Sequence, residues 1–184
     1  MTMTKTDPRE ITLDILLEVL EEGRLGHLVL NQALLKYQYL EKKERAFITR
    51  VSEGTIQYMI ELDYIINQFS KVKVNKMKPV IRNILRMSVY QLKYMDSVPD
   101  SAVCNEAVKL AKRKGFGSLS GFVNGVLRNI SRNLSSITYP DGQKDQIQYL
   151  SVHYSMPEWI VKQWINDYGM ERTVSVLQAF LQEA

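Results

Sequence analysis

The residues with the clearest chemical potential in this sequence are lysines and arginines gathered in one stretch. Between Lys71 and Arg132 there are 13 basic residues and 3 acidic ones, whereas the rest of the chain has 11 basic and 17 acidic residues. The modest overall charge of +4 therefore hides a strongly basic region. Such regions bind phosphate groups, because each neutralised phosphate releases condensed counterions. The alternative interpretation is a charged face that only keeps the protein in solution.

The first candidate site for phosphate contact is the run Lys112-Arg113-Lys114, beside the Gly115-Phe116-Gly117 turn. No acidic residue adjoins this run in the sequence, so we expect all three side chains to contact phosphates. For Arg82 and Arg128 we weigh a structural role, such as pairing with Glu106, equally with phosphate contact. The further candidates are Lys71, Lys73, Lys76, Arg82, Arg86, Arg128 and Arg132.

By contrast, the sequence contains no complete set of catalytic residues. The single cysteine, Cys104, lies within a helical pattern, and we interpret it as a packing residue. His27 and His153 are far apart and have no cysteine nearby to complete a metal site. The glycines of Gly115-Phe116-Gly117 follow no strand, so they indicate a turn between helices and not a cofactor loop. The isolated carboxylates, which no second acid or histidine accompanies at catalytic spacing, are Glu53, Asp63 and Glu106.

Helical periodicity predicts the elements that position these residues. Apolar side chains recur every three or four residues through most of the chain, which is typical of an all-α bundle. We expect the helix over 42–70 to be continuous and central, and Gly54 within it to be compensated by close approach of another helix or by a kink. Residues 71–76 are expected to form a basic loop. The remaining helices are expected at about 8–22, 28–35, 79–95, 101–114 and 119–130.

The composition changes after Arg132. Residues 133–142 are rich in Ser, Asn, Pro and Gly, so we expect a weakly anchored linker that a protease would cut first. Short helices are expected beyond it, over 146–152, from 157 to 169 and over 171–182. Trp159 and Trp164 could stack on bases, but we favour packing inward or against another domain.

Composition limits the class of protein. The chain of 184 residues is 45% hydrophobic, as globular proteins are, and has no apolar run near the roughly 20 residues of a membrane span. Residues 1–8 are polar and lack the apolar core of a secretory signal. Because a single cysteine cannot form an internal disulfide, a cytoplasmic location is expected.

Five ordered motifs carry a family resemblance. They are Arg82-Asn83-Ile84-Leu85-Arg86, Tyr90-Gln91-Leu92, Val98-Pro99, Asn105-Glu106-Ala107-Val108 and Phe122-Val123-Asn124-Gly125-Val126-Leu127-Arg128. Together they resemble the NusB-type RNA-binding domain, as found at the N-terminus of bacterial RsmB (Sun) type 16S ribosomal RNA cytosine-C5 methyltransferases. The run from Tyr154 to Trp164, followed by Tyr168-Gly169, resembles the segment that leads into the methyltransferase domain of those enzymes.

The resemblance implies a NusB-type helical bundle with a small C-terminal helical extension. Residues 1–134 would form the NusB-like RNA-binding domain, and 135–184 the linker and the helical start of the segment leading into a methyltransferase domain. The implied partners are 16S ribosomal RNA and that domain in cis, with no membrane and no metal.

The implied function is RNA binding that positions the substrate of a methyltransferase. The intact enzyme would use S-adenosylmethionine, whereas this part, without the cofactor motif and catalytic cysteine, is expected to be inactive and to bind no cofactor. The alternatives are a free-standing NusB-type antitermination factor that binds RNA with a ribosomal protein, and a helical protein-interaction module whose basic face is incidental.

Overall fold

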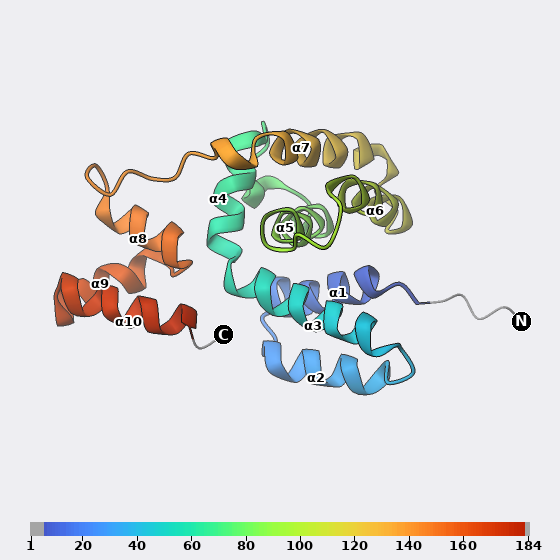
Figure 1. Cartoon of the computed structure of the whole chain (residues 1–184), viewed down its shortest axis with the longest axis horizontal. Coiled ribbons are helices and arrows are strands. Elements are labelled where there is room, and N and C mark those ends of the chain that lie inside the picture. Colours follow the sequence, from blue (N-terminus) through green and yellow to red (C-terminus); the bar gives the residue numbers. More distant parts are fainter. Residues whose placement is uncertain (1–5, 183–184) are drawn as a thin grey trace, which may run out of the picture.

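The computed structural model describes residues 6–182, and every regular element in that range is helical, which confirms the all-α prediction (Figure 1). Residues 1–5 and 183–184 lie outside the described range, and with them most of the polar N-terminus discussed above. The helices are α1 (Pro8–Leu16), α2 (Gly26–Lys36), α3 (Lys42–Gln57), α4 (Met59–Phe69), α5 (Pro79–Tyr94), α6 (Asp100–Arg113), α7 (Ser120–Arg132), α8 (Gln146–Tyr154), α9 (Glu158–Tyr168) and α10 (Met170–Gln182).

The central element is α5, which α1, α3, α4, α6 and α7 surround (Figure 1). It begins at Pro79, whose fixed φ suits the first turn of a helix. Burial is nearly complete from Ile81 to Leu92 and includes polar side chains such as Asn83 and Gln91. The prediction that the 42–70 segment is central is therefore wrong, because α3 and α4 each cover only one side of α5.

The 42–70 segment is also not one helix. It breaks at Tyr58, where φ is −99° and ψ is 15°, and α4 leaves α3 in a new direction (Figure 1). The ring of Tyr58 stacks on Tyr94 of α5 at a centroid distance of 4.7 Å. This ring contact and the burial of Leu62 and Ile65 against α5 compensate for the interrupted helix.

Gly54 lies where another helix approaches closely, which was one of the two explanations expected for a glycine at this position. A Cβ atom placed on Gly54 would collide with the ring of Tyr90, which occupies the space next to α3 at this point. Tyr90 in turn packs against Tyr94 at 5.3 Å between ring centroids. The missing side chain of Gly54 therefore allows α3 and α5 to pack around a tyrosine cluster.

The C-terminal helices α8, α9 and α10 form a separate small core around Leu150, Val161 and Leu177. The segment that leads to them is not weakly anchored, contrary to our expectation. Leu134 and Ile137 pack against the main core, and Gln68 exchanges two hydrogen bonds with the backbone of Thr138, at 2.8 and 3.3 Å. The apolar and amide contacts that fix residues 134–138 come from distant parts of the chain.

Tyr139 extends this anchoring into a buried polar cluster. Its hydroxyl and the carboxylate of Glu61, whose side chain is only 5% exposed, both bind the ammonium of Lys93. The Tyr94 hydroxyl donates to the same carboxylate at 2.9 Å, and the Tyr139 ring stacks on Tyr64. A buried charge pair is costly to separate, so this cluster fixes where the linker crosses α4 and α5.

We predict that Gly54→Ala destabilises the fold by about 1–3 kcal/mol, because the added methyl group overpacks the contact with Tyr90. Gly125→Ala is the matched control, since a Cβ atom at that helical position meets open space. Alanine should stabilise that site by about 0.5–1 kcal/mol through its helix propensity. Urea unfolding followed by circular dichroism measures both, and equal effects of the two variants would contradict the close-packing explanation.

Candidate nucleic-acid interface

The ten basic candidates lie in four places: the loop between α4 and α5, the body of α5, the end of α6 and the exposed side of α7. The structure gives them very different surroundings. Some are paired with carboxylates, and others have no ionic partner among residues 6–182.

Arg82 and Arg86, both on α5, belong to a largely buried ion-pair network. The Arg82 guanidinium donates two bonds to the carboxylate of Glu21, one of them 2.6 Å from Nε to Oε1. Arg86 makes a bidentate pair with Asp63 at 2.7 and 2.9 Å, and its side chain is only 9% exposed. Asn83 donates to Glu21 and accepts from Arg86, which joins the two pairs. These guanidinium groups hold α5 against its neighbours.

Arg113 and Lys114 also have acidic partners, although none adjoins them in the sequence. Arg113 binds Asp7 at 2.9 Å and Glu10 at 3.2 Å, and Lys114 binds Asp14 at 2.9 Å and Glu10 at 3.4 Å. All three carboxylates come from the start of the chain, at or near α1. The sequence lacks an acidic neighbour for this run, but the fold brings three carboxylates to it. These pairs are partly exposed, so each is worth less than about 1 kcal/mol.

Four candidate lysines have no ionic partner in the described part of the chain. Lys71, Lys73 and Lys76 are exposed on the α4–α5 loop, where Val74 is buried and its N–H donates to the Asn67 side chain at 2.9 Å. The expected basic loop is thus present, with one 3-10 turn over Val74–Lys76. Lys112 is exposed on α6.

Lys112 lies in a groove of about 490 Å³ between α6 and α7. Arg128 of α7 also lines this groove, where it donates to the side chains of Asn105 and Asn124 at 2.9 and 3.2 Å. Arg132, one turn further along α7, donates from Nε to the backbone oxygen of Arg128 at 3.2 Å. Sequence reasoning proposed both arginines but missed the two asparagines, whose only signal was their place in the family motifs.

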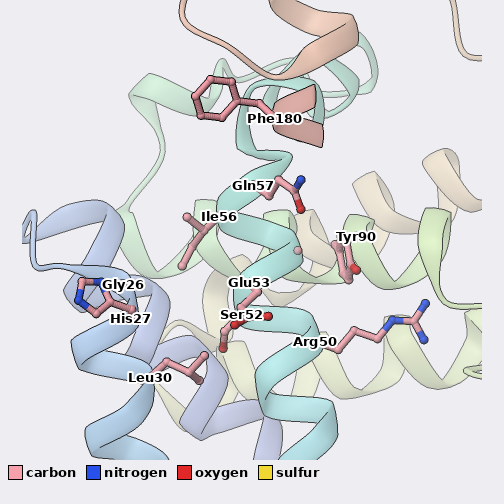
Figure 2. Close-up of a pocket in the computed structure, with 11 residues that line it drawn as sticks. Gly26, His27, Leu30, Arg50, Ser52, Glu53, Ile56, Gln57, Tyr90 and Phe180 are labelled. Atoms are coloured by element: carbon pink, nitrogen blue, oxygen red, sulfur yellow. The ribbon is translucent and has the colours of Figure 1, made fainter. Parts of the chain in front are cut away.

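A second depression, of about 760 Å³, lies over α3 between α2 and α5, with Phe180 of α10 at one end (Figure 2). It contains Ser52, Glu53 and His27, residue types that can form a catalytic triad. The Ser52 side chain is fully buried and its hydroxyl has no hydrogen-bond partner within residues 6–182. It is therefore not bonded to His27, and this set of residues is not a triad.

The other residues singled out in the sequence have structural surroundings. Cys104 is fully buried, which agrees with a packing role, and burial raises the pKa of its thiol. Trp164 stacks on Phe180, whereas Trp159 is 68% exposed. Inward packing is therefore confirmed for Trp164 only. In residues 6–182 no three His, Cys, Asp or Glu side chains are grouped as metal ligands. No helix in that range is long and apolar enough to cross a membrane.

The fold and its surfaces together define an all-helical protein with a basic, amide-rich groove on one side. Comparison with known proteins then places it more narrowly. The NusB family model matches residues 6–132, and the chain belongs to the NusB family.

Two kinds of relative align with this chain. The probable ribosomal RNA small subunit methyltransferase B of Bacillus subtilis (strain 168) is 36% identical over 179 residues, which is 97% of this chain and 39% of that protein. The transcription antitermination protein NusB of Dehalococcoides mccartyi (strain 195) is 32% identical over 136 residues, which is 73% of this chain and 94% of that protein. The chain thus spans about two fifths of the length of the methyltransferase relative.

Solved structures share the fold. The antitermination factor NusB in complex with NusE and double-stranded RNA gives a TM-score of 0.63 at 21% identity over 72% of this chain and 98% of that chain. The crystal structure of PH0851 gives a TM-score of 0.69 at 17% identity, over 95% of this chain and 38% of that chain. The first similarity confirms the NusB-type fold. The second extends through the C-terminal helices, so the helical extension is shared with a solved structure.

We predict that the Glu21–Arg82 pair gives the fold an acid-sensitive component. The Arg82 hydrogen bonds hold the pKa of Glu21 below its ordinary value, so this stabilisation is complete above about pH 4.3 and is lost as the pH falls through the lowered pKa. Glu21→Gln should cost about 2–3 kcal/mol at pH 7, and its difference from the native protein should shrink towards pH 3. Urea unfolding across this pH range tests the sign.

The matched control for that experiment is Glu22→Gln. Glu22 is the next residue, is exposed and has no ion pair within the described range. The control should change the stability at pH 7 by less than about 0.5 kcal/mol. If both variants lose the same stability, or if the Glu21→Gln difference persists at low pH, the ion pair is not the source of the acid sensitivity.

Proposed function

We propose that this chain is an RNA-binding domain that positions ribosomal RNA for a small-subunit rRNA cytosine-C5 methyltransferase of the RsmB type. The observation that carries the proposal is the extent of the two alignments. A match over 179 residues must include most of α8, α9 and α10, whereas the antitermination protein leaves about a quarter of this chain without a counterpart. The extension is therefore a feature that this chain shares with the methyltransferase relatives.

The division at residues 134 and 135 follows from the same proposal. Residues 1–134 would hold RNA, and 135–184 would connect this domain to the methyltransferase domain in cis. The family-model boundary at residue 132 and the separate core of α8 to α10 support this division. The buried cluster of Tyr139, Lys93 and Glu61 would keep the two parts in a fixed orientation, which positioning a substrate requires.

The cofactor of such an enzyme, S-adenosylmethionine, would bind elsewhere in the intact protein. Residues 6–182 contain no β-strand, so they lack the strand, glycine-rich turn and helix on which a doubly wound domain binds that cofactor. The residues described here do not fit the cofactor, and we derive no step of methyl transfer from them. Binding and orienting the RNA is the contribution that this chain can make.

A free-standing antitermination factor is the second candidate. Its support is the NusB family match and the relatives that are named as antitermination proteins. The structure of NusB with NusE and double-stranded RNA supports RNA binding by either candidate. The two candidates differ in α8 to α10, which a free-standing factor would not need and which a substrate-positioning domain would.

The RNA contacts are proposed for the exposed lysines that have no ionic partner in the described range, Lys71, Lys73, Lys76 and Lys112. Replacing all four by alanine should weaken binding to a 16S rRNA fragment and lower the magnitude of its salt slope by about 3 units, at roughly 0.7–0.9 per lost phosphate contact. Fluorescence anisotropy over a salt series measures both quantities.

The control is Lys42→Ala with Lys43→Ala, exposed residues at the start of α3, on the side of the molecule opposite α7 (Figure 1). Equal salt slopes for the fourfold variant and the native protein would contradict the proposed contacts. In the full-length enzyme, the fourfold change should raise KM for rRNA more than it lowers kcat, because it acts on binding. A full-length protein that does not methylate 16S rRNA would favour the antitermination candidate.

A further inference from the structure

The groove between α6 and α7 has an unusual chemical character. Its polar lining side chains are cations, amides and one hydroxyl, and no carboxylate lines it. Its volume of about 490 Å³ can hold a phosphate group together with its sugar. The lining residues are Asn105, Val108, Lys109, Lys112, Ser120, Gly121, Asn124 and Arg128.

Arg128 fixes which way the two amides face. Its Nη2 donates to Oδ1 of Asn105 at 2.9 Å, and its Nε donates to Oδ1 of Asn124 at 3.2 Å. An arginine side chain has donors only, so each asparagine must turn its oxygen towards the guanidinium. The NH2 groups of both asparagines are thereby left as donors, and no hydrogen bond within the described residues uses them. The amide orientations are thus set by the chemistry of Arg128.

Two lysines add charge to these donors. Lys112 has no ionic partner in residues 6–182. Lys109 is exposed and pairs only with the half-buried Glu106, at 3.2 Å, a pair that costs little to break. Ser120 is the exception among the polar groups, because its hydroxyl already donates to the Gly117 backbone oxygen at 2.7 Å. The groove therefore presents three cations and two amide donors.

Gly121 leaves part of one wall of the groove without a side chain. A Cβ atom there would meet nothing within 4 Å, so no close internal contact requires glycine. An open wall next to a set of donors leaves room for a ligand to approach the helix backbone.

We infer that the α6–α7 groove is a binding site for one backbone phosphate of RNA, held by Asn105, Asn124, Arg128, Lys109 and Lys112. This rests on the proposed function and adds to it a defined ligand group. A phosphate carries only acceptor oxygens and a negative charge, and both match the lining. A base edge is a poorer match, because most base edges mix donors with acceptors, and the acceptor-only edge of guanine is uncharged.

Asn105→Asp combined with Asn124→Asp is the decisive variant. Each new carboxylate keeps an oxygen for Arg128, so the fold should be retained, but the amide donors are replaced by negative charge. We expect binding to a single-stranded oligouridylate, which has no guanine, to weaken about tenfold or more and its salt slope to fall by about one unit. The matched control is Asn129→Asp, a change of the same type at an exposed position of α7. It is compared with the single variant Asn124→Asp.

A neutral phosphate locates the contact on the RNA. In a series of oligouridylates, each with one methylphosphonate, one position should weaken binding to the native protein at least fivefold and have little further effect on the double variant. Circular dichroism and the urea midpoint of the double variant check that the fold is intact.

The outcomes separate the two proposals. If the Asn124→Asp and Asn129→Asp variants bind oligouridylate equally well and the double variant shows no greater loss, the groove is not a phosphate site, although RNA binding itself stands. A loss confined to RNAs that contain guanine would replace the phosphate by a base edge and overturn the inference. A native protein that binds neither oligouridylate nor the 16S rRNA fragment would overturn both the inference and the proposed function.

Discussion

The structure depends on the burial of α5 on nearly all sides. A helix in that position has to satisfy every polar group that it brings into the interior, since an unpaired charge there would cost several kcal/mol. Arg82, Arg86 and Lys93 are therefore matched by Glu21, Asp63 and Glu61 from the surrounding elements. The charges of Arg82, Arg86 and Lys93 are thus each compensated by a carboxylate from a neighbouring element, which gives these three side chains a structural role.

The same principle sorts the remaining basic residues. Pairs at the surface, such as those of Arg113 and Lys114 with the carboxylates near α1, are weak and can be exchanged for other anions. The groove between α6 and α7 differs from both classes, because Arg128 is bound there by neutral amides and keeps its charge uncompensated. Charge that is oriented but not neutralised is what a phosphate-binding surface requires.

The arrangement of the tyrosines links the core to the C-terminal helices. Gly54 admits Tyr90 between α3 and α5, Tyr90 packs on Tyr94, and Tyr94 shares the Glu61 carboxylate with Lys93 and Tyr139. The linker is thus held by groups whose positions depend on the packing of the central helix. A domain that positions a substrate benefits from such a connection, because a loose linker would not transmit an orientation.

The sequence by itself determined the helical class and most helix boundaries, because these depend on local effects: apolar periodicity, the fixed φ of Pro79 and the turn around Gly115. It also located the basic region. Only the tertiary structure decided that the 42–70 segment breaks at Tyr58, since a ring contact with another helix compensates for the lost turn. Only it could show that Arg82, Arg86, Lys93, Arg113 and Lys114 are paired. Their carboxylate partners lie from 23 to 106 residues away in the sequence, a separation that no local pattern encodes.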